Sequence, residues 1–307
     1  MCIRDSLYTE MITADAVLHG DRERLLARGP SENPVALQLG GAVPGKLAAA
    51  ARIGGEFGYD EINLNIGCPS DRVQSGRFGA CLMAEPQLVA ACVEAMKLAV
   101  DIPVTVKCRI GIDEQNPEHV LPKFTSLMGE AGADALIIHA RKAWLKGLSP
   151  KQNRDVPPLD HALVHRLKTS MPQFKMIING GICTLEEARD HLAHIDGVMI
   201  GRAAYHAPEL LAKVDSELFS VPDQGGATDT IVRRYLDYIE AECARGTPLI
   251  AMTRHMLGLF HGAPGARAWR RHLAQNAHRA GAGPDVVEDA LGIIESVRAQ
   301  AASRQAA

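Results

Sequence analysis

The most informative stretch of the chain is Glu61-Ile62-Asn63-Leu64-Asn65-Ile66-Gly67-Cys68-Pro69-Ser70. Its first six residues alternate between polar and apolar, which is the period of a β-strand. The strand ends at the glycine, and the proline prevents the sheet ladder from continuing. Cys68 is therefore predicted in the first turn after a buried strand, where barrel enzymes carry functional residues. A lone cysteine is also common in protein cores, so the rest of the chain must decide its role.

Strands and helices alternate regularly along the first two thirds of the chain. The predicted strands are 7–11, 35–39, 61–66, 104–107, 135–139, 175–179 and 197–201. The predicted helices are 13–27, 44–57, 86–100, 120–131, 159–170, 185–194 and 208–219. The strands are mainly apolar, as in a parallel sheet buried on both faces. This pattern predicts an α/β fold, a TIM (β/α)8-type barrel over residues 1–222, rather than an open doubly wound sheet.

Seven β-α units are predicted where a full barrel has eight. The spacing leaves no room for another unit inside the chain, so we expect the first unit to be missing. The sequence leaves open whether the barrel has an open seam, which would leave the strands at 7–11 and 198–200 as unpaired edges. Residues 1–6 fit no element, and the sequence leaves open whether they are native. After a linker at 220–227, a small helical domain is predicted over residues 228–307. Its helices are expected at 230–245, 248–260, 266–278 and 285–302.

The composition is that of a globular protein with one or two domains: 307 residues, 47% hydrophobic, with a formal net charge of −3. The seven cysteines are scattered and form no C-x-x-C pair, so neither a disulfide framework nor a metal site is predicted. The sequence has no apolar run long enough to cross a membrane and no signal peptide. We expect a cytoplasmic monomer that requires no protein partner.

Polar residues or glycines follow each predicted strand, at the edge where a barrel carries its active site. Each one alone is as well explained by structure, but seven in succession favour a functional site. In chain order they are Glu10, Gln38, Asn65 with Cys68, Lys107 with Arg109, His139 with Arg141, Asn179 with Gly180 and Gly181, and Gly201 with Arg202.

The last two of these turns predict a phosphate site. Their glycines allow backbone N–H groups to approach an anion, and Arg202 can pair with it. Lys107 and His139 at neighbouring strand ends, together with Gln38, suit a flavin, because a cation stabilises the reduced pyrimidine edge. No G-x-G-x-x-G or Walker motif follows a strand, so a Rossmann nicotinamide site is not predicted.

Two basic stretches of the sequence contain no acidic residue. Residues 141–154 hold five Lys or Arg with Trp144, and residues 243–284 hold six Arg and four His with Trp269. A solvated basic face is the simpler explanation. We favour an anionic polymer bound across these stretches, with the aromatic rings available to stack on bases.

Taken together, these motifs resemble the flavin-dependent tRNA-dihydrouridine synthases. Asn65-Ile66-Gly67-Cys68-Pro69 matches the family signature, and residues 79–83, 104–107, 137–141, 178–181 and 200–202 follow in the family's order and spacing. Residues 142–154 and 258–262 resemble the A-type subfamily, and the resemblance covers about residues 7–300. The family's first strand, with an Ala-Pro-Met motif, has no counterpart in this sequence.

The resemblance implies an FMN-dependent, NADPH-driven reduction of uridine to 5,6-dihydrouridine in the tRNA D-loop, at U20 and U20a. Cys68 is the implied general acid, which protonates C5 after a hydride reaches C6 of a flipped-out uracil. The implied FMN ligands are Gln38, Lys107, His139, Asn179, Gly180, Gly181, Gly201 and Arg202. The implied contacts with the uracil and the tRNA are Asn65, Arg109, Lys151, Arg154, Arg267, Arg270 and Arg271.

Two other functions stay open from the sequence. A barrel flavoenzyme that reduces a free pyrimidine or another small enone needs no basic helical domain, so salt-sensitive tRNA binding would argue against it. A truncated RNA-binding remnant without catalysis is the second alternative, and a bound flavin would exclude it.

Overall fold

The computed structural model describes residues 6–29, 32–222 and 226–305. The predictions for residues 1–5 and for the middle of the linker lie outside the described residues. The strands are β1 (Leu7–Tyr8), β2 (Ile12–Thr13), β3 (Val35–Gly40), β4 (Glu61–Ile66), β5 (Val104–Arg109), β6 (Ala135–His139), β7 (Met176–Asn179) and β8 (Gly197–Met199).

The strands form one curved parallel sheet in the order β1-β3-β4-β5-β6-β7-β8. β2 pairs with the same strand as β1, so the predicted strand at 7–11 is an interrupted strand over 7–13. Among the described strands no pairing joins β1 to β8, and these two form the edges of the sheet. The predicted α/β barrel-type fold is confirmed.

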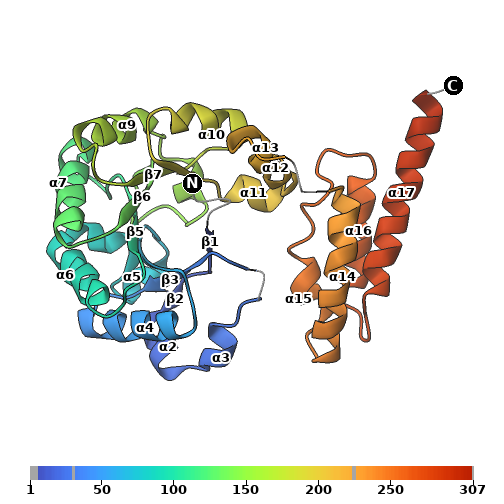
Figure 1. Cartoon of the computed structure of the whole chain (residues 1–307), viewed down its shortest axis with the longest axis horizontal. Helices are drawn as coiled ribbons and strands as arrows, with labels where there is room; N and C mark the ends of the chain where they lie inside the picture. Colours follow the sequence, from blue (N-terminus) through green and yellow to red (C-terminus); the bar gives the residue numbers. More distant parts are fainter. Residues whose placement is uncertain (1–5, 30–31, 223–225, 306–307) are drawn as a thin grey trace. The chain divides into compact units, whose positions relative to one another are not determined.

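Helices cover the outer face of the sheet, with shorter helices in the loops (Figure 1). The outer helices are α2 (Ala14–His19), α3 (Arg22–Leu25), α4 (Pro44–Glu56), α6 (Pro86–Lys97), α7 (Pro117–Glu130), α9 (His161–Ser170) and α10 (Leu185–Leu192). The shorter ones are α5 (Asp71–Ser75), the 3₁₀ helix η1 (Gly79–Ala84) and α8 (Gln152–Asp155). The single helix predicted over 13–27 is instead α2 and α3. The helix breaks because Gly20 adopts an extended conformation and Asp21 caps a new helix at Arg24 N.

Three aspartates fix the amino ends of three strands. Asp60 accepts from Val35 N at 2.8 Å, and Asp134 accepts from Val104 N at 2.6 Å. Asp196 accepts from Met176 N at 2.8 Å. Each aspartate directly precedes the neighbouring strand, so it sets where the two strands of a pair begin relative to each other. This register carries through to the opposite edge, where the polar residues lie.

By contacts the chain divides into two compact units, residues 1–182 with 186–200, and residues 183–185 with 201–307. The helices of the second unit are α11 (Arg202–His206), α12 (Glu209–Ala212), α13 (Val214–Leu218), α14 (Thr228–Ala244), α15 (Leu249–Thr253), α16 (Ala266–Asn276) and α17 (Asp285–Gln305). Within the second unit Tyr205 of α11 meets His255, with 3.0 Å between the hydroxyl and Nδ1. The predicted domain boundary at 222–228 stays a prediction. The predicted helix at 208–219 is divided into α12 and α13.

The second unit has its own apolar core. Trp269 and Phe260 meet edge to face with ring centroids 5.0 Å apart, and the buried faces of α14, α16 and α17 surround them. Such a core satisfies the main requirement for an independently packed unit.

Candidate active site

The sheet register places the polar residues of neighbouring strands side by side. Along each strand they occupy alternate positions, so their side chains lie on the same face of the sheet. The aligned sets are Gln38 with Asn63 and Thr105, then Asn65 with Lys107, then Arg109 with His139 and Asn179. The residues predicted from separate strand ends are therefore brought together from β3 to β7.

The turn that carries Cys68 is held by the side chain before it. Asn65 Oδ1 accepts from the backbone N–H groups of Gly67 and Cys68, both at 3.0 Å. The Cys68 carbonyl accepts from Ala80 N at 3.0 Å, and its thiol lies 3.6 Å from the Ser70 hydroxyl. The thiol is thus half-buried and fixed at a strand end, as expected for a reacting group.

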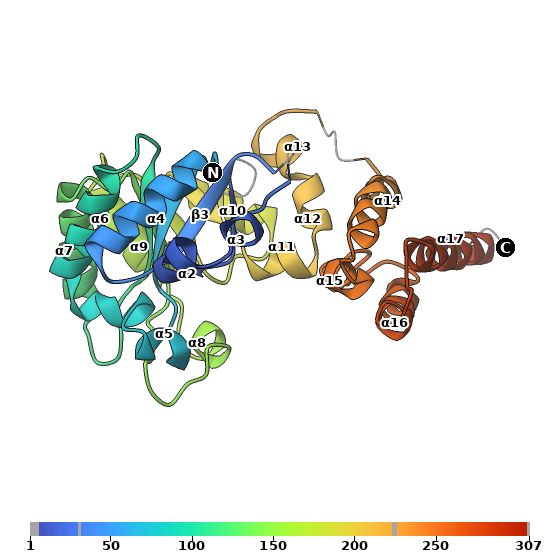
Figure 2. The same ribbon diagram turned by 90° about the horizontal axis from the view of Figure 1, so that it is seen from below.

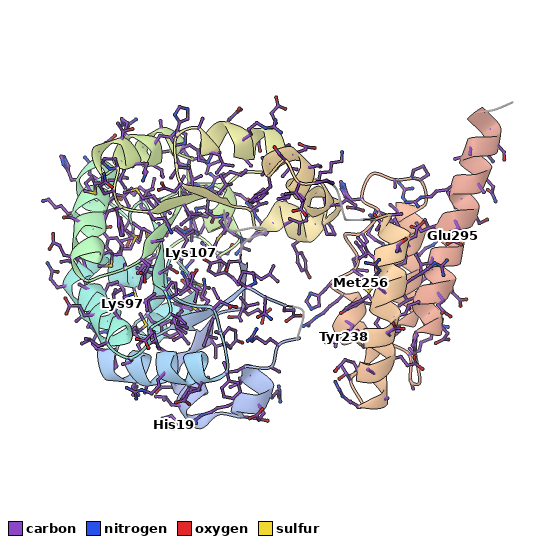
Figure 3. All side chains as sticks on the ribbon, in the orientation of Figure 1. His19, Lys97, Lys107, Tyr238, Met256 and Glu295 are labelled. Atoms are coloured by element: carbon purple, nitrogen blue, oxygen red, sulfur yellow. The ribbon has the colours of Figure 1, made fainter. Side chains whose placement is uncertain are left out.

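Lys107 lies on the inner side of the curved sheet, as Figure 3 shows. Its side chain is half-buried. Burial, and then the nearby Arg109 cation, lower the pKa of Lys107 to about 8. Burial and the Arg109 cation destabilise the protonated form of Lys107, and a negative charge beside it would stabilise that form. The position therefore suits a ligand that carries negative charge on the atoms facing Lys107.

Arg109 is buried, with 4% of its surface exposed, and joins three loops. Its Nε donates to Gly67 O at 3.1 Å, and a terminal nitrogen donates to Asn153 O at 3.0 Å. The same nitrogen lies 3.3 Å from His139 Nδ1. Burial, followed by the charge of Arg154, lowers the pKa of Arg109 to about 10. These contacts are to the protein's own loops, and the predicted contact between Arg109 and the substrate stays a prediction.

The turn after β7 requires its two glycines. Gly180 has φ +110° and Gly181 φ +78°, a region that disfavours side chains. A Cβ on Gly181 would lie 2.4 Å from Leu159 Cδ1, and one on Gly180 would lie 3.2 Å from the His139 ring. The Asn179 amide donates to Met199 O at 2.7 Å, which ties β7 to β8. Because residues 180 and 181 have no side chains, a ligand beside His139 could approach the main-chain groups of this turn.

Gly201 and Arg202 lie at the start of α11, in the second compact unit. Their predicted partnership with Gly180 and Gly181 in one phosphate site therefore stays a prediction.

A cavity of about 890 Å³ lies along β1 and β2 and reaches the active-site turn. Cys68 and Ser70 line one end of it, and Tyr8 and Tyr59 lie among the residues farther along. Its described lining contains none of the predicted flavin ligands. The thiol therefore has open space on the side of the N-terminal strands.

Lys151 directly precedes the short helix α8, and Arg154 lies within it. Both side chains are exposed. The helix is held from below by the fully buried Asn153, whose carboxamide accepts from Trp144 N at 2.7 Å. Figure 2 shows α8 and α5 on the same side of the sheet. The Gln74 amide of α5 donates to Leu145 O at 2.8 Å, which fixes this loop beside the Cys68 turn.

The three arginines predicted on the helical domain share one exposed face of α16. Arg267, Arg270 and Arg271 are exposed at i, i+3 and i+4 spacing, and none of them forms an ion pair with a described residue. Trp269 differs from its predicted role as a base-stacking ring. It is fully buried and donates from Nε1 to Met256 O at 3.0 Å, because the apolar face of α16 needs it as the centre of the core.

Two predicted absences concern only the described residues. In that part of the chain no cluster of three His, Cys, Asp or Glu is arranged to hold a metal ion. No helix there is both long and apolar enough to cross a membrane.

Sequence reasoning overlooked Asn63 and Thr105, which are aligned with the predicted ligand Gln38 in the sheet. The signal was present, because Asn63 stands two residues before Asn65, and Thr105 two before Lys107. Alternation on a strand places such pairs on one face.

The fold and the site together define an enzyme of the β/α-barrel class, with a thiol and a half-buried lysine at one edge of its parallel sheet. Residues 3–295 match the family model described as Dihydrouridine synthase (Dus). The chain therefore belongs to the dihydrouridine synthase family and is an oxidoreductase.

Curated relatives agree with this assignment. The three described here are each named tRNA-dihydrouridine(20/20a) synthase. The protein of Vibrio vulnificus (strain CMCP6) is 57% identical over 94% of this chain and 88% of its own length. That of Escherichia coli (strain K12) is 55% identical over 95% of this chain and 85% of its own. That of Xanthomonas axonopodis pv. citri (strain 306) is 54% identical over 93% of this chain and 85% of its own.

Proposed function

We propose that this chain reduces uridine to 5,6-dihydrouridine in the D-loop of tRNA, at positions 20 and 20a, with FMN as cofactor and NADPH as reductant. The observation that carries the proposal is the half-buried Cys68 thiol at the same sheet edge as Lys107. The names of the curated relatives support the tRNA substrate and its positions.

The residues present fit a flavin. Lys107 offers a cation that burial destabilises, and so favours a negative pyrimidine edge beside it. The two glycines after β7 leave space that a Cβ would fill. In the proposal, the groups that hold FMN are Gln38, Lys107, His139, Asn179, Gly180, Gly181, Gly201 and Arg202. When bound, FMN would supply the hydride that reaches C6 of the uracil.

Cys68 supplies the proton in this reaction. Hydride addition at C6 places negative charge on C5 and O4, and the thiol proton passes to C5 as the C5–H bond forms. The thiolate then regains a proton from solvent. Asn65 and Arg154 hold the extruded uracil, and Asn65 also keeps the thiol turn in place through the contacts described above. Arg109, Lys151, Arg267, Arg270 and Arg271 would contact the tRNA.

Replacement of the thiol tests the proposal. We expect Cys68→Ala to reduce turnover on tRNA by about 10²–10⁴-fold, the usual contribution of a general acid, while NADPH still reduces the flavin at the wild-type rate. Stopped-flow absorbance measures the flavin step, and mass spectrometry of digested tRNA measures dihydrouridine.

Cys81→Ala is the matched control, because Cys81 in the neighbouring η1 is also half-buried and its thiol donates to Phe78 O, just before η1. It should retain turnover. Equal turnover by Cys68→Ala and wild type would remove Cys68 from the mechanism, and a wild-type protein without flavin would contradict the proposed cofactor.

The proposal also includes a monomer that works in the cytoplasm, where its tRNA substrates occur and its scattered thiols stay reduced. Sedimentation of the FMN-loaded protein should give the mass of one chain.

A further inference from the structure

A chain of side-chain hydrogen bonds runs through the inside of the sheet to the Cys68 turn. It begins at Glu61, whose Oε1 accepts from Tyr8 at 2.9 Å and from the Thr105 hydroxyl. Thr105 Oγ1 in turn accepts from Asn63 Nδ2 at 2.8 Å.

The chain continues upward through two amides. Asn63 Oδ1 accepts from Gln38 Nε2 at 2.9 Å, and Gln38 Oε1 accepts from Asn65 Nδ2 at 2.7 Å. Asn65 Oδ1 then accepts from the backbone N–H groups of Gly67 and Cys68. Five side chains from β3, β4 and β5 thus connect the amino end of the sheet to the turn that holds the thiol.

Every bond in this chain has the same direction, and the two ends determine it. At the lower end, the Glu61 oxygen accepts from two hydroxyls, and it acts as an acceptor whether or not the other oxygen is protonated. At the upper end, backbone N–H groups can only donate. The orientation of each amide between the ends follows, because each nitrogen must face the next acceptor.

The middle of the hydrogen-bonded chain is buried. Asn63 is fully buried and Thr105 is 4% exposed, so removing a partner there leaves a polar group unsatisfied at a substantial cost. The reaction as proposed uses Gln38 and Asn65 at the upper end. It assigns nothing to the three residues below them.

We propose that Glu61, Asn63 and Thr105 are positioning residues, which fix the Asn65 carboxamide and thereby hold the Cys68 turn in its reactive geometry. This inference rests on the proposed role of Cys68 as proton donor. With the chain broken at Thr105 or Asn63, Gln38 loses its fixed orientation, Asn65 can rotate, and the two N–H groups of the turn lose their acceptor.

Two substitutions break the chain at different points. Thr105→Val keeps the side-chain shape and removes the hydroxyl, and Asn63→Val removes both the donor and the acceptor of the central amide. Thr105→Ser keeps the hydroxyl and should restore wild-type behaviour. Thr125→Val is the matched control, because the equally buried Thr125 hydroxyl donates only to Leu121 O, within α7.

The first measurement uses the protein without substrate. Alkylation of Cys68 by iodoacetamide, resolved from the other thiols by peptide mass spectrometry, should become several-fold faster in Thr105→Val and Asn63→Val. Thr105→Ser and Thr125→Val should keep the wild-type rate. Wild-type alkylation of Cys68 in both breaking variants would overturn the inference.

The second measurement uses the FMN-loaded enzyme and tRNA. A displaced proton donor lowers kcat, so we expect kcat on tRNA to fall by about tenfold or more, with flavin reduction by NADPH retained. An effect on KM alone would contradict a positioning role toward Cys68.

Two further results keep the inference separate from the proposed function and from failed folding. In the wild-type protein, hydrogen exchange at the Gly67 and Cys68 amides should be slow, and rapid exchange there would overturn the inference even if both breaking variants unfold. If the wild-type protein forms no dihydrouridine, the proposed function fails, while the alkylation and exchange results still decide whether the chain positions the thiol.

Discussion

Strand alternation determines which face of the sheet the side chains of this site lie on, and burial shifts the pKa of the charged ones. Lys107 and Arg109 lie two residues apart on β5, so both face the inside of the sheet. Burial and then the Arg109 cation lower the pKa of Lys107, whereas burial and then the Arg154 cation lower that of Arg109. Backbone carbonyls compensate Arg109. Lys107 is left as the cation best placed to respond to a ligand.

This arrangement predicts a pH-dependent affinity for FMN. Protonated Lys107 attracts the flavin, so affinity should be constant at acidic pH and fall as the pH rises through about 8, the pKa of this lysine in the flavin-free protein. By linkage, bound FMN raises that pKa. Fluorescence titration of FMN from about pH 6 to about pH 10 measures the effect.

Lys107→Met should bind FMN more weakly and without this pH dependence. Lys97→Met is the control, because Lys97 pairs with Asp134 outside the sheet at 2.8 Å. An affinity that is independent of pH in the wild-type protein would contradict the proposed contact between Lys107 and the flavin.

Among the elements, η1 has a specific task beside the Cys68 turn. Its first residue, Gly79, has φ +74°, and a Cβ there would lie 2.7 Å from Cys68 O and 2.4 Å from Val73 Cγ1. The glycine allows Ala80 N to reach the Cys68 carbonyl. The turn is thus held from two sides, by Asn65 from within the sheet and by η1 from outside.

Gly79→Ala should disturb this contact. We expect a loss of about 1–3 kcal/mol in the free energy of unfolding, because the left-handed backbone and the clash with Cys68 O both penalise a side chain. Turnover on tRNA should fall as well. Urea denaturation and the dihydrouridine assay measure the two effects.

Gly55→Ala serves as the control, since Gly55 lies in α4 and a Cβ there meets only Val100 at 3.7 Å. It should leave turnover unchanged and stabilise the protein by up to about 1 kcal/mol. If both glycine variants had equal stability and equal turnover, the assigned role of Gly79 would be wrong.

At the scale of the whole molecule, two units with separate cores divide the proposed work. The sheet unit carries the thiol and Lys107. The helical unit presents a row of exposed arginines on α16 that form no ion pair with any residue in the described part of the chain. Other arginines of the helical unit, such as Arg233 and Arg245, pair with Glu295 and Glu242. Arginines without a carboxylate partner are the ones available to bind the phosphates of tRNA.

The α16 row should therefore contribute to the salt dependence of tRNA binding. Arg267→Ala with Arg271→Ala should weaken binding at low salt, and should reduce the slope of log affinity against log salt by roughly 0.7–0.9 for each phosphate that is no longer neutralised. Filter binding over a salt series measures the slope.

Arg233→Ala with Arg245→Ala removes the same charge from positions that already have carboxylate partners, and it should change the slope less. Equal slopes for the α16 pair and the wild-type protein would exclude α16 from the tRNA interface.

The sequence by itself determined the parallel sheet, the strand ends and the location of the thiol. These follow from local signals, namely alternation on strands, helical spacing and the Gly-Cys-Pro turn, which act over a few residues. The family resemblance rests on the same local motifs, and the family model confirms it.

Only the tertiary structure decided what those side chains contact. Strand register aligned Gln38, Asn63 and Thr105 from three separate segments into one hydrogen-bonded chain. Arg109 is buried and donates to the protein's own loops. Trp269 lies in the core of the helical unit and not on a surface that could bind RNA. Register and burial depend on which distant segments pack together, and no local pattern in the chain contains that information.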